Sequence, residues 1–228
     1  MPTITKTADS SDGWARNKAA FAAGWAVAQG DATTTGAGSN FTTGFYNFAV
    51  YNARVAGRGA DSYYNGRSFF EFDLSGESGT ATSATFQSRM DHEGVGTGTE
   101  DEVIMVAATA LAGSNADYGN VYSSGTTWGT AYSSNTAISS TLGVQTITLN
   151  AAAITAINSA IGSGNFVCAM VGHYFDYLGN TPLLADSGNP YTRIRLEFSE
   201  APASFRPILT TTTSVAVTDN ATFFGANF

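Results

Sequence analysis

The alternation of hydrophobic and polar positions predicts β-strands along most of the chain. Phe70, Phe72 and Leu74 alternate with Glu71 and Asp73, which is the period of a strand that buries one face. Five further segments show the same alternation or a short, uninterrupted apolar run, and we expect each to be a strand: residues 83–90, 103–107, 144–149, 166–171 and 192–198. Residues 41–55, rich in alternating aromatic side chains, predict one more strand or a hairpin.

One segment carries a complete set of helix signals. Asn150 is a favourable N-cap residue, isoleucines recur on one side between Ile154 and Ile161, and Gly162 follows as a stop. These features predict a short helix over about residues 151–161.

Two regions are harder to assign. Between Trp14 and Ala28 the spacing is helical, but the glycines there and the Thr/Gly tract that follows favour extended chain, so we favour strands. Residues 114–141 are rich in Gly, Ser, Asn and Thr and also contain several aromatic side chains. Because aromatic side chains need somewhere to pack, we expect an ordered excursion with about one strand.

Composition supports the same fold class. Only 12% of the 228 residues are charged, about half of the roughly 25% usual in soluble domains, and there are 25 glycines. Long amphipathic helices need charged side chains on their wet face, so an all-helical fold is excluded. The single cysteine, Cys168, cannot form an internal disulfide, and its apolar neighbours in sequence predict a buried thiol.

The charge balance argues against two classes of partner. Ten Lys and Arg against eighteen Asp and Glu give a net charge of −8, so we expect no nucleic-acid partner and no anionic membrane surface. The longest apolar stretches are too short to span a bilayer. The first residues lack the apolar core of a secretory signal, so we expect no signal peptide.

The chain length suits one large domain, which we place at residues 1–200. Residues 201–228 contain a threonine run and two short apolar segments around an Asp-Asn pair, which predicts a hairpin too small to be stable alone. We expect this C-terminal extension to pack on a neighbouring domain or subunit. Its candidate assembly contacts are Val215, Val217, Phe223 and Phe224.

Two successive segments carry a resemblance to known domains: RSFFEFDLS at residues 67–75 and TSATF at residues 82–86. They resemble the DNRLRE-type, carbohydrate-binding-module-like β-sandwiches, and especially their relatives among bacteriophage structural proteins. The resemblance covers residues 9–199 and implies a jelly-roll β-sandwich. With the helix and the C-terminal segment inferred above, the expected fold is all-β: a jelly-roll β-sandwich with one short helix and a C-terminal strand hairpin or extension. The chain departs from the group at Phe86, where the group prefers Leu, and at Thr192, where it prefers an apolar residue.

The sequence offers no convincing catalytic set, so we do not expect an enzyme. It has two histidines, His92 and His173, and neither lies in a recognisable nucleophile elbow. The glycine-rich residues 94–98 follow an acidic triplet and open no helix, so they do not indicate a phosphate site or a nucleotide cofactor.

An acidic set surrounds this glycine-rich loop: Asp91, Glu93 and Asp101, with Glu100 and Glu102 beside them. A solvated loop is the favoured interpretation. The alternative is a site for Ca²⁺ or another hard cation, which prefers several oxygen ligands. Paired carboxylates for glycoside hydrolysis rank last, because the loop has no rigid cleft in its pattern.

Two aromatic groups have the residue types of a sugar-binding surface. They are Tyr63 with Tyr64, and Tyr174 with Tyr177 around Asp176. Aromatic planes beside carboxylate or amide acceptors stack on sugar rings, but aromatic side chains also fill sandwich ends and subunit contacts. We favour packing or subunit contact, and keep glycan stacking as the alternative.

Together these features predict a non-enzymatic structural protein of a bacteriophage virion, either a capsid decoration protein or part of a fibre or tail. Its expected partners are identical subunits and other virion proteins, because a hydroxyl-rich surface with few charges costs little to desolvate. The alternative function is a carbohydrate-binding module that recognises a host-surface glycan.

Overall fold

The computed structural model describes residues 2–30, 47–58, 60–93, 99–112, 115–124, 127–185, 189–199 and 201–214. The strands are β1 (Thr3–Thr7), β2 (Gly13–Ala20), β3 (Asn47–Val55), β4 (Ser62–Asp73), β5 (Thr80–His92), β6 (Glu102–Ala107), β7 (Tyr122–Ser124), β8 (Thr127–Trp128), β9 (Thr136–Ala137), β10 (Gly143–Thr148), β11 (Asn165–Gly172), β12 (Thr192–Leu196) and β13 (Ile208–Ser214). The helical segments are η1 (Phe21–Ala23), α1 (Trp25–Gln29), η3 (Thr99–Asp101), η4 (Asn115–Gly119), α2 (Ala151–Ala160) and the π-helical turn η5 (His173–Tyr177). Among the described helices, none has the length and apolar character needed to cross a membrane.

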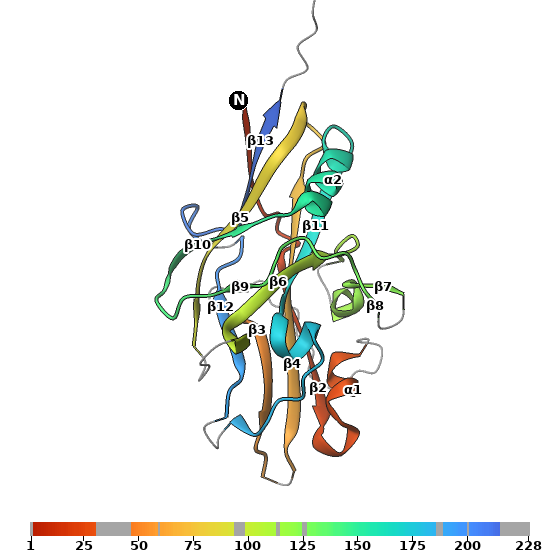
Figure 1. Cartoon of the computed structure of the whole chain (residues 1–228), viewed down its shortest axis with the longest axis vertical. Helices are drawn as coiled ribbons and strands as arrows, with labels where there is room; N and C mark the ends of the chain where they lie inside the picture. The colour runs from red at the N-terminus through yellow and green to blue at the C-terminus, as the bar shows by residue number, and fades with distance from the viewer. Residues whose placement is uncertain are drawn as a thin grey trace, which may run out of the picture.

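The two longest strands, β4 and β5, organise the sheet (Figure 1). Strand β4 pairs with β2 along one edge, and with β3 and then β11 along the other. Strand β5 pairs with β10 along one edge, and with β13 and then β12 along the other. Because β12 also pairs with β3, the sheet continues from β5 to β4 and folds the two long strands toward each other. The result is the all-β sandwich that the sequence predicts.

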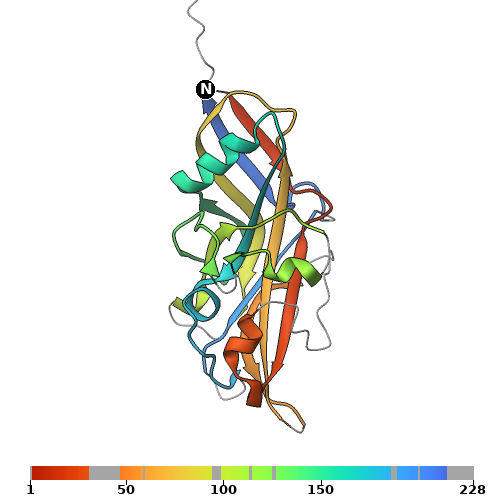
Figure 2. The same cartoon turned by 90° about the vertical axis from the view of Figure 1, so that its right-hand side faces the viewer.

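Aromatic side chains from the two long strands meet in the core. The ring centroids of Phe70 in β4 and Phe86 in β5 are 4.7 Å apart, and Phe198 stacks on Phe70 at 6.1 Å. Helix α2 packs across β5 and β11 at one end of the molecule, which is elongated (Figure 2). Its buried side chains, including Ile157, extend the same core. The alternation of apolar and polar residues in the sequence therefore arises because every second side chain of these strands faces the core.

The helix prediction is confirmed. The Asn150 side chain accepts hydrogen bonds from the backbone N–H groups of Ala152 and Ala153 at 2.9 and 3.1 Å, so it caps the first turn. Gly162 follows the helix with φ of +75°, a backbone conformation that favours glycine.

The two uncertain regions differ in part from their predictions. The segment from Trp14 to Ala28 is divided between strand β2 and the short helix α1, with Gly24 at φ of +86° between η1 and α1. The helical spacing therefore belongs only to the end of this region. The excursion after residue 114 contains the short strands β7, β8 and β9, where the sequence predicts about one.

The main sheet continues beyond the predicted boundary at residue 200. Strand β13 lies between β1 and β5 in the main sheet, with Thr210 opposite both Thr5 and Thr85. Leu209 and Thr211 are buried, so the threonine run hides an ordinary alternating strand in which a small hydroxyl side chain faces inward. The candidate contact residues Val215, Val217, Phe223 and Phe224 lie outside the described residues.

Candidate functional site

A fully buried ion pair lies at the centre of the most elaborate group of polar residues. Arg67 in β4 donates from Nε to Asp176 Oδ2 at 2.7 Å and from Nη2 to Asp176 Oδ1 at 2.8 Å, and neither side chain is exposed. Asp176 belongs to the turn η5, and its Oδ1 also accepts from Asn65 Nδ2 at 2.7 Å. Burial lowers the pKa of Arg67, but the charge and hydrogen bonds of Asp176 outweigh it and raise that pKa overall. The guanidinium is therefore permanently charged.

Backbone carbonyls and aromatic rings complete the surroundings of Arg67. Nη1 donates to the carbonyl oxygen of Tyr118 at 3.0 Å, and Nη2 donates to that of Gln29 at 2.8 Å. The guanidinium carbon lies 4.1 Å from the ring centroid of Tyr118, 5.0 Å from that of Tyr122 and 4.9 Å from that of Trp128. Such contacts are favourable because the ring faces carry negative partial charge. This one side chain thus joins β4, α1, η4, the β7–β8 hairpin and η5.

The first hollow, which we call the Trp128 hollow, lies next to this ion pair and has a volume of about 310 Å³. Its walls include Gln29, Trp128, Tyr177 and Gly179. The ring centroids of Trp128 and Tyr177 are 5.3 Å apart, and both side chains are partly exposed. Gln29 is held by hydrogen bonds from its Nε2 to the carbonyl oxygens of Phe175 (3.2 Å) and Asp176 (2.7 Å). The hollow therefore combines aromatic planes with a fixed amide.

The second hollow, which we call the Tyr174 hollow, has a volume of about 260 Å³. Its lining consists of Glu100, Tyr174, Phe175, Asn180, Thr181, Leu183 and Pro190. Asn180 Nδ2 donates to the carbonyl oxygen of Tyr174 at 2.9 Å, which ties the segment after η5 back to the turn. Tyr174 and Tyr177 thus line different hollows, although the sequence predicts them as one group.

The other predicted sugar-binding residues are placed differently. Asp176 is fully buried and engaged by Arg67, so it presents no acceptor to a ligand at the surface. Tyr63 is 5% exposed and packs against Trp25, with ring centroids 5.7 Å apart. Tyr64 points to the opposite face of β4, where it is partly exposed and 6.0 Å from the ring of Tyr51. The structure does not bring these side chains together into one surface.

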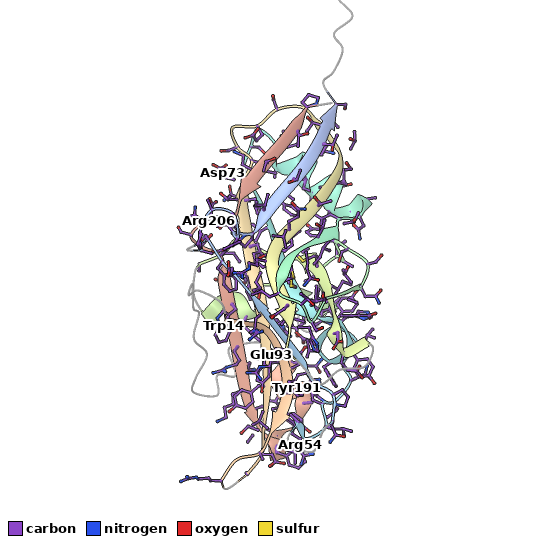
Figure 3. The ribbon with its side chains drawn as sticks, turned by 90° about the vertical axis from the view of Figure 1, so that its left-hand side faces the viewer. Trp14, Arg54, Asp73, Glu93, Tyr191 and Arg206 are labelled. Carbon is purple, nitrogen blue, oxygen red and sulfur yellow. The ribbon has the colours of Figure 1, made fainter. Side chains whose placement is uncertain are left out.

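The acidic set is tied to basic side chains of neighbouring strands. Asp91 accepts from Arg195 Nε at 2.9 Å, and Glu93 lies 3.1 Å from Arg195 Nη1 and 3.6 Å from Arg193 Nε. These contacts join the end of β5 to β12, and Figure 3 shows Glu93 beside β12 on the same side of the molecule as Tyr191.

Two more members of this set contact histidines. Asp101 lies 2.9 Å from His92 Nε2, and Glu102 lies 3.1 Å from His173 Nδ1. Partial burial raises the pKa of Asp101, His92 opposes this effect, and the negative charges of Glu100 and Glu102 add to the rise. Within the described ranges, no three acidic, histidine or cysteine side chains are grouped so that they could hold a metal ion. The Ca²⁺ site at Asp91, Glu93 and Asp101 stays a prediction without support from this geometry.

Sequence reasoning missed Arg67 and Trp128. The sequence did contain a feature that points to Arg67. This arginine lies just before the apolar run of β4, and a charged residue that is buried with it needs a buried counter-ion. Trp128 stands in a polar segment, where a large aromatic side chain marks either a packing or a binding position. No protein-family model and no curated protein matches the sequence. The resemblance to phage sandwich domains therefore stays a prediction from the motifs at residues 67–75 and 82–86.

Proposed function

We propose that the protein is a non-enzymatic structural component of a bacteriophage virion, a capsid decoration protein or part of a fibre or tail. It works through contacts with identical subunits and other virion proteins. The observation that carries this proposal is that the side chains able to act in catalysis, the histidines and nearby carboxylates, form contacts within the chain. Both histidines and most of the carboxylates near them contact oppositely charged or polar groups on other segments of the same chain.

This use of side chains favours a rigid scaffold. The pairs Arg67–Asp176, Arg89–Glu197 and Arg195–Asp91 each join residues that are more than one hundred positions apart. Buried or partly buried pairs of this kind restrict how the strands can be arranged. A protein that must keep one shape among many neighbouring copies benefits from such constraints.

The exposed surface also favours contact with other proteins. Threonine and serine dominate the described strands at one end of the molecule, where β1 and β13 pair (Figure 1). Strand β10 forms a further edge of the sheet and exposes 57% of Val144. Surfaces with few charges bury at low desolvation cost when identical copies come together.

The test is assembly onto the particle. We expect the protein to co-sediment with purified virions at a fixed ratio to the major capsid protein, measured by quantitative mass spectrometry. A chain that ends at Ser214 keeps β13, whereas one that ends at residue 205 loses it and is expected to unfold. Loss of the longer truncated chain from particles, with its melting temperature unchanged, supports assembly through the C-terminal residues. Absence of the full chain from purified virions contradicts the proposal.

Glycan recognition is a second candidate function, favoured by the Trp128 hollow. Partly exposed rings of Trp128 and Tyr177 border a space of about 310 Å³ beside the amide of Gln29. A glycan array tests this candidate, with Tyr177→Ala as the variant and Tyr64→Ala as the control, since Tyr64 is a partly exposed tyrosine away from the hollow. Saturable binding that only Tyr177→Ala removes supports it, and no binding to any glycan contradicts it.

A further inference from the structure

We propose that the Tyr174 hollow binds the cationic head of a lysine or arginine side chain presented by a partner protein. The hollow joins an aromatic wall, an acidic residue and amide and hydroxyl groups in a space of about 260 Å³. The inference rests on the proposed contact function for the source of the ligand. The binding chemistry itself depends only on the residues of the hollow.

Among the described acidic residues around this hollow, Glu100 is the one that lacks a basic partner. Asp91 and Glu93 contact arginines, and Asp101 and Glu102 contact histidines. In the part of the chain that the structure describes, no arginine, lysine or histidine lies within ion-pair distance of Glu100, while its carbonyl oxygen accepts from Thr192 Oγ1 at 2.7 Å. The backbone of this acidic residue is thus fixed while its charge stays unmatched.

Further carboxylates lie close to Glu100. Glu100 and Glu102 both raise the pKa of Asp101, which means that they disfavour further negative charge at this place. The whole chain carries a net charge of −8. A positively charged group that enters the hollow therefore gains from the charge of Glu100, and the net negative charge of the chain favours its approach.

The rest of the lining fits the other parts of such a side chain. Tyr174 and Phe175 supply aromatic rings, which meet edge to face with centroids 5.0 Å apart. Leu183, 56% exposed, and Pro190 supply apolar surface for the aliphatic stem that both lysine and arginine carry. The acidic, aromatic and apolar parts thus match the head and the stem of one long basic side chain.

The same chain already binds a cation by this chemistry. Arg67 is held by a carboxylate, by carbonyl oxygens and by three aromatic rings. The Tyr174 hollow offers a carboxylate, an amide and aromatic rings to a cation from outside. A neutral sugar ring would use the aromatic wall but would leave the charge of Glu100 unmatched, so a cation is the ligand that the lining favours.

The experiment uses the isolated full chain and two small probes of nearly equal shape. N-acetyl-arginine amide carries the charge, and N-acetyl-citrulline amide replaces the guanidinium by a neutral urea. We expect the arginine probe to shift the NMR signals of the Asn180 side-chain amide and the Leu183 methyl groups in a saturable way. Citrulline should bind at least about fivefold more weakly, because it lacks the charge–charge and cation–π attraction. Added salt should weaken the binding of the arginine probe.

Two variants make the test specific to the hollow. Glu100→Gln should weaken binding of the arginine probe about as much as the change to citrulline does, and Tyr174→Leu should weaken it further while the backbone spectrum stays native. Glu77→Gln is the matched control, because it removes the same charge in the β4–β5 turn, where Glu77 contacts Lys6. This control should leave the affinity unchanged.

Several outcomes overturn the inference: no saturable binding, equal binding of the two probes, or unchanged affinity in Glu100→Gln. Saturable binding of methyl glycosides with shifts at the same residues also overturns it. This experiment uses no virus particle. A negative result with the probes therefore does not contradict the virion proposal, which the co-sedimentation test decides. In the same way, if the protein does not co-sediment with virions, the measured affinity for the arginine probe still decides whether the hollow binds a cation.

Discussion

Asp176 receives two charge-assisted hydrogen bonds from Arg67, a residue 109 positions earlier in the chain. Both side chains are fully buried, and the pair joins the middle of β4 to the turn η5 between the two hollows. A charge pair without water depends on each member for the neutralisation of the other. The positions of Trp128, Tyr174 and Tyr177 therefore depend on the Arg67–Asp176 ion pair, although none of these three residues is a member of it.

Removal of one member of this pair should destabilise the protein strongly. We expect Arg67→Met and Asp176→Leu each to lower the free energy of unfolding by about 3–5 kcal/mol, because each leaves a buried charge without a partner. The double variant should lose less than the sum of the two single losses. Urea unfolding followed by fluorescence measures all three values, and a double-mutant cycle isolates the coupling.

Strict additivity in that cycle would contradict the coupled role of the pair. Arg89→Met serves as the comparison, because Arg89 also contacts a carboxylate, Glu197, but is itself partly exposed. Its loss should cost clearly less than that of Arg67.

Gly172 should tolerate no side chain. A Cβ atom at this position would collide with the side chain of Asn52, which donates a hydrogen bond to Asn65, which in turn donates to Asp176. We expect Gly172→Ala to cost about 1–3 kcal/mol, the usual range for overpacking. Gly76→Ala is the control, since apart from its two chain neighbours no residue comes within 4 Å of the place that its Cβ would take. Thermal unfolding measures both, and equal melting temperatures would refute the prediction.

Several strands were predictable from sequence because apolar and polar residues alternate along them or because they form a short apolar run. Phe70 and Phe72 alternate with polar residues, so the period of two is visible without knowing any partner strand. The structure differs in one respect: Glu71 between them is only 9% exposed, so β4 is buried on both faces and not on one as predicted. The cap of α2 was predictable as well, since Asn150 bonds to the N–H groups two and three residues later. Strand β13 was missed because buried Thr211 and Thr213 do not differ from their exposed neighbours in residue type.

The candidate sites were predictable only in part, because they are built from distant segments. Tyr174, Asp176 and Tyr177 are close in sequence and form one group there, yet the π-helical turn directs Asp176 inward. The Trp128 hollow unites α1, the β7–β8 hairpin and η5, and no local pattern relates these three segments. Glu100 differs from its acidic neighbours only once their arginine and histidine partners are placed in space.

Asp9 should make the protein less stable at neutral pH than at mildly acidic pH. Partial burial, followed by the charges of Glu71 and Asp73, raises the pKa of Asp9 above its ordinary value of 3.8. The folded state therefore binds this proton more tightly than the unfolded state does. Its destabilising effect is present above the raised pKa and disappears as the pH falls from there to 3.8.

We expect Asp9→Asn to raise the melting temperature at neutral pH by about 1 °C and to reduce the pH dependence in this window. Asp73→Asn is a control of opposite sign, because hydrogen bonds from Ser75 lower the pKa of Asp73. That carboxylate stabilises the fold above pH 3.8, and the contribution is lost as the pH falls through its lowered pKa. Melting curves recorded from about pH 3 to pH 7 check both, and an Asp9→Asn variant that melts lower at neutral pH would be contrary to expectation.

Cys168 should be unreactive in the folded protein. The thiol is 1% exposed in β11, and burial raises its pKa far above the ordinary range for cysteine. Because the thiolate is the reactive form, a disulfide reagent should modify the native chain only as fast as the chain unfolds. The reaction is followed by absorbance, with the denatured chain as the reference for full reactivity. Rapid modification under native conditions would show that β11 opens locally.

The pairing of β1 with β13 has a consequence for synthesis of the chain. Thr213 bonds to the carbonyl oxygen of Pro2, 211 positions earlier, so the first described strand has no sheet neighbour until β13 has been synthesised. Contacts so far apart in sequence are formed slowly. Until β13 is available, the composition of β1 protects this unpaired strand from aggregation. Ile4 is its one apolar residue, and Lys6 places a charge on its unpaired edge.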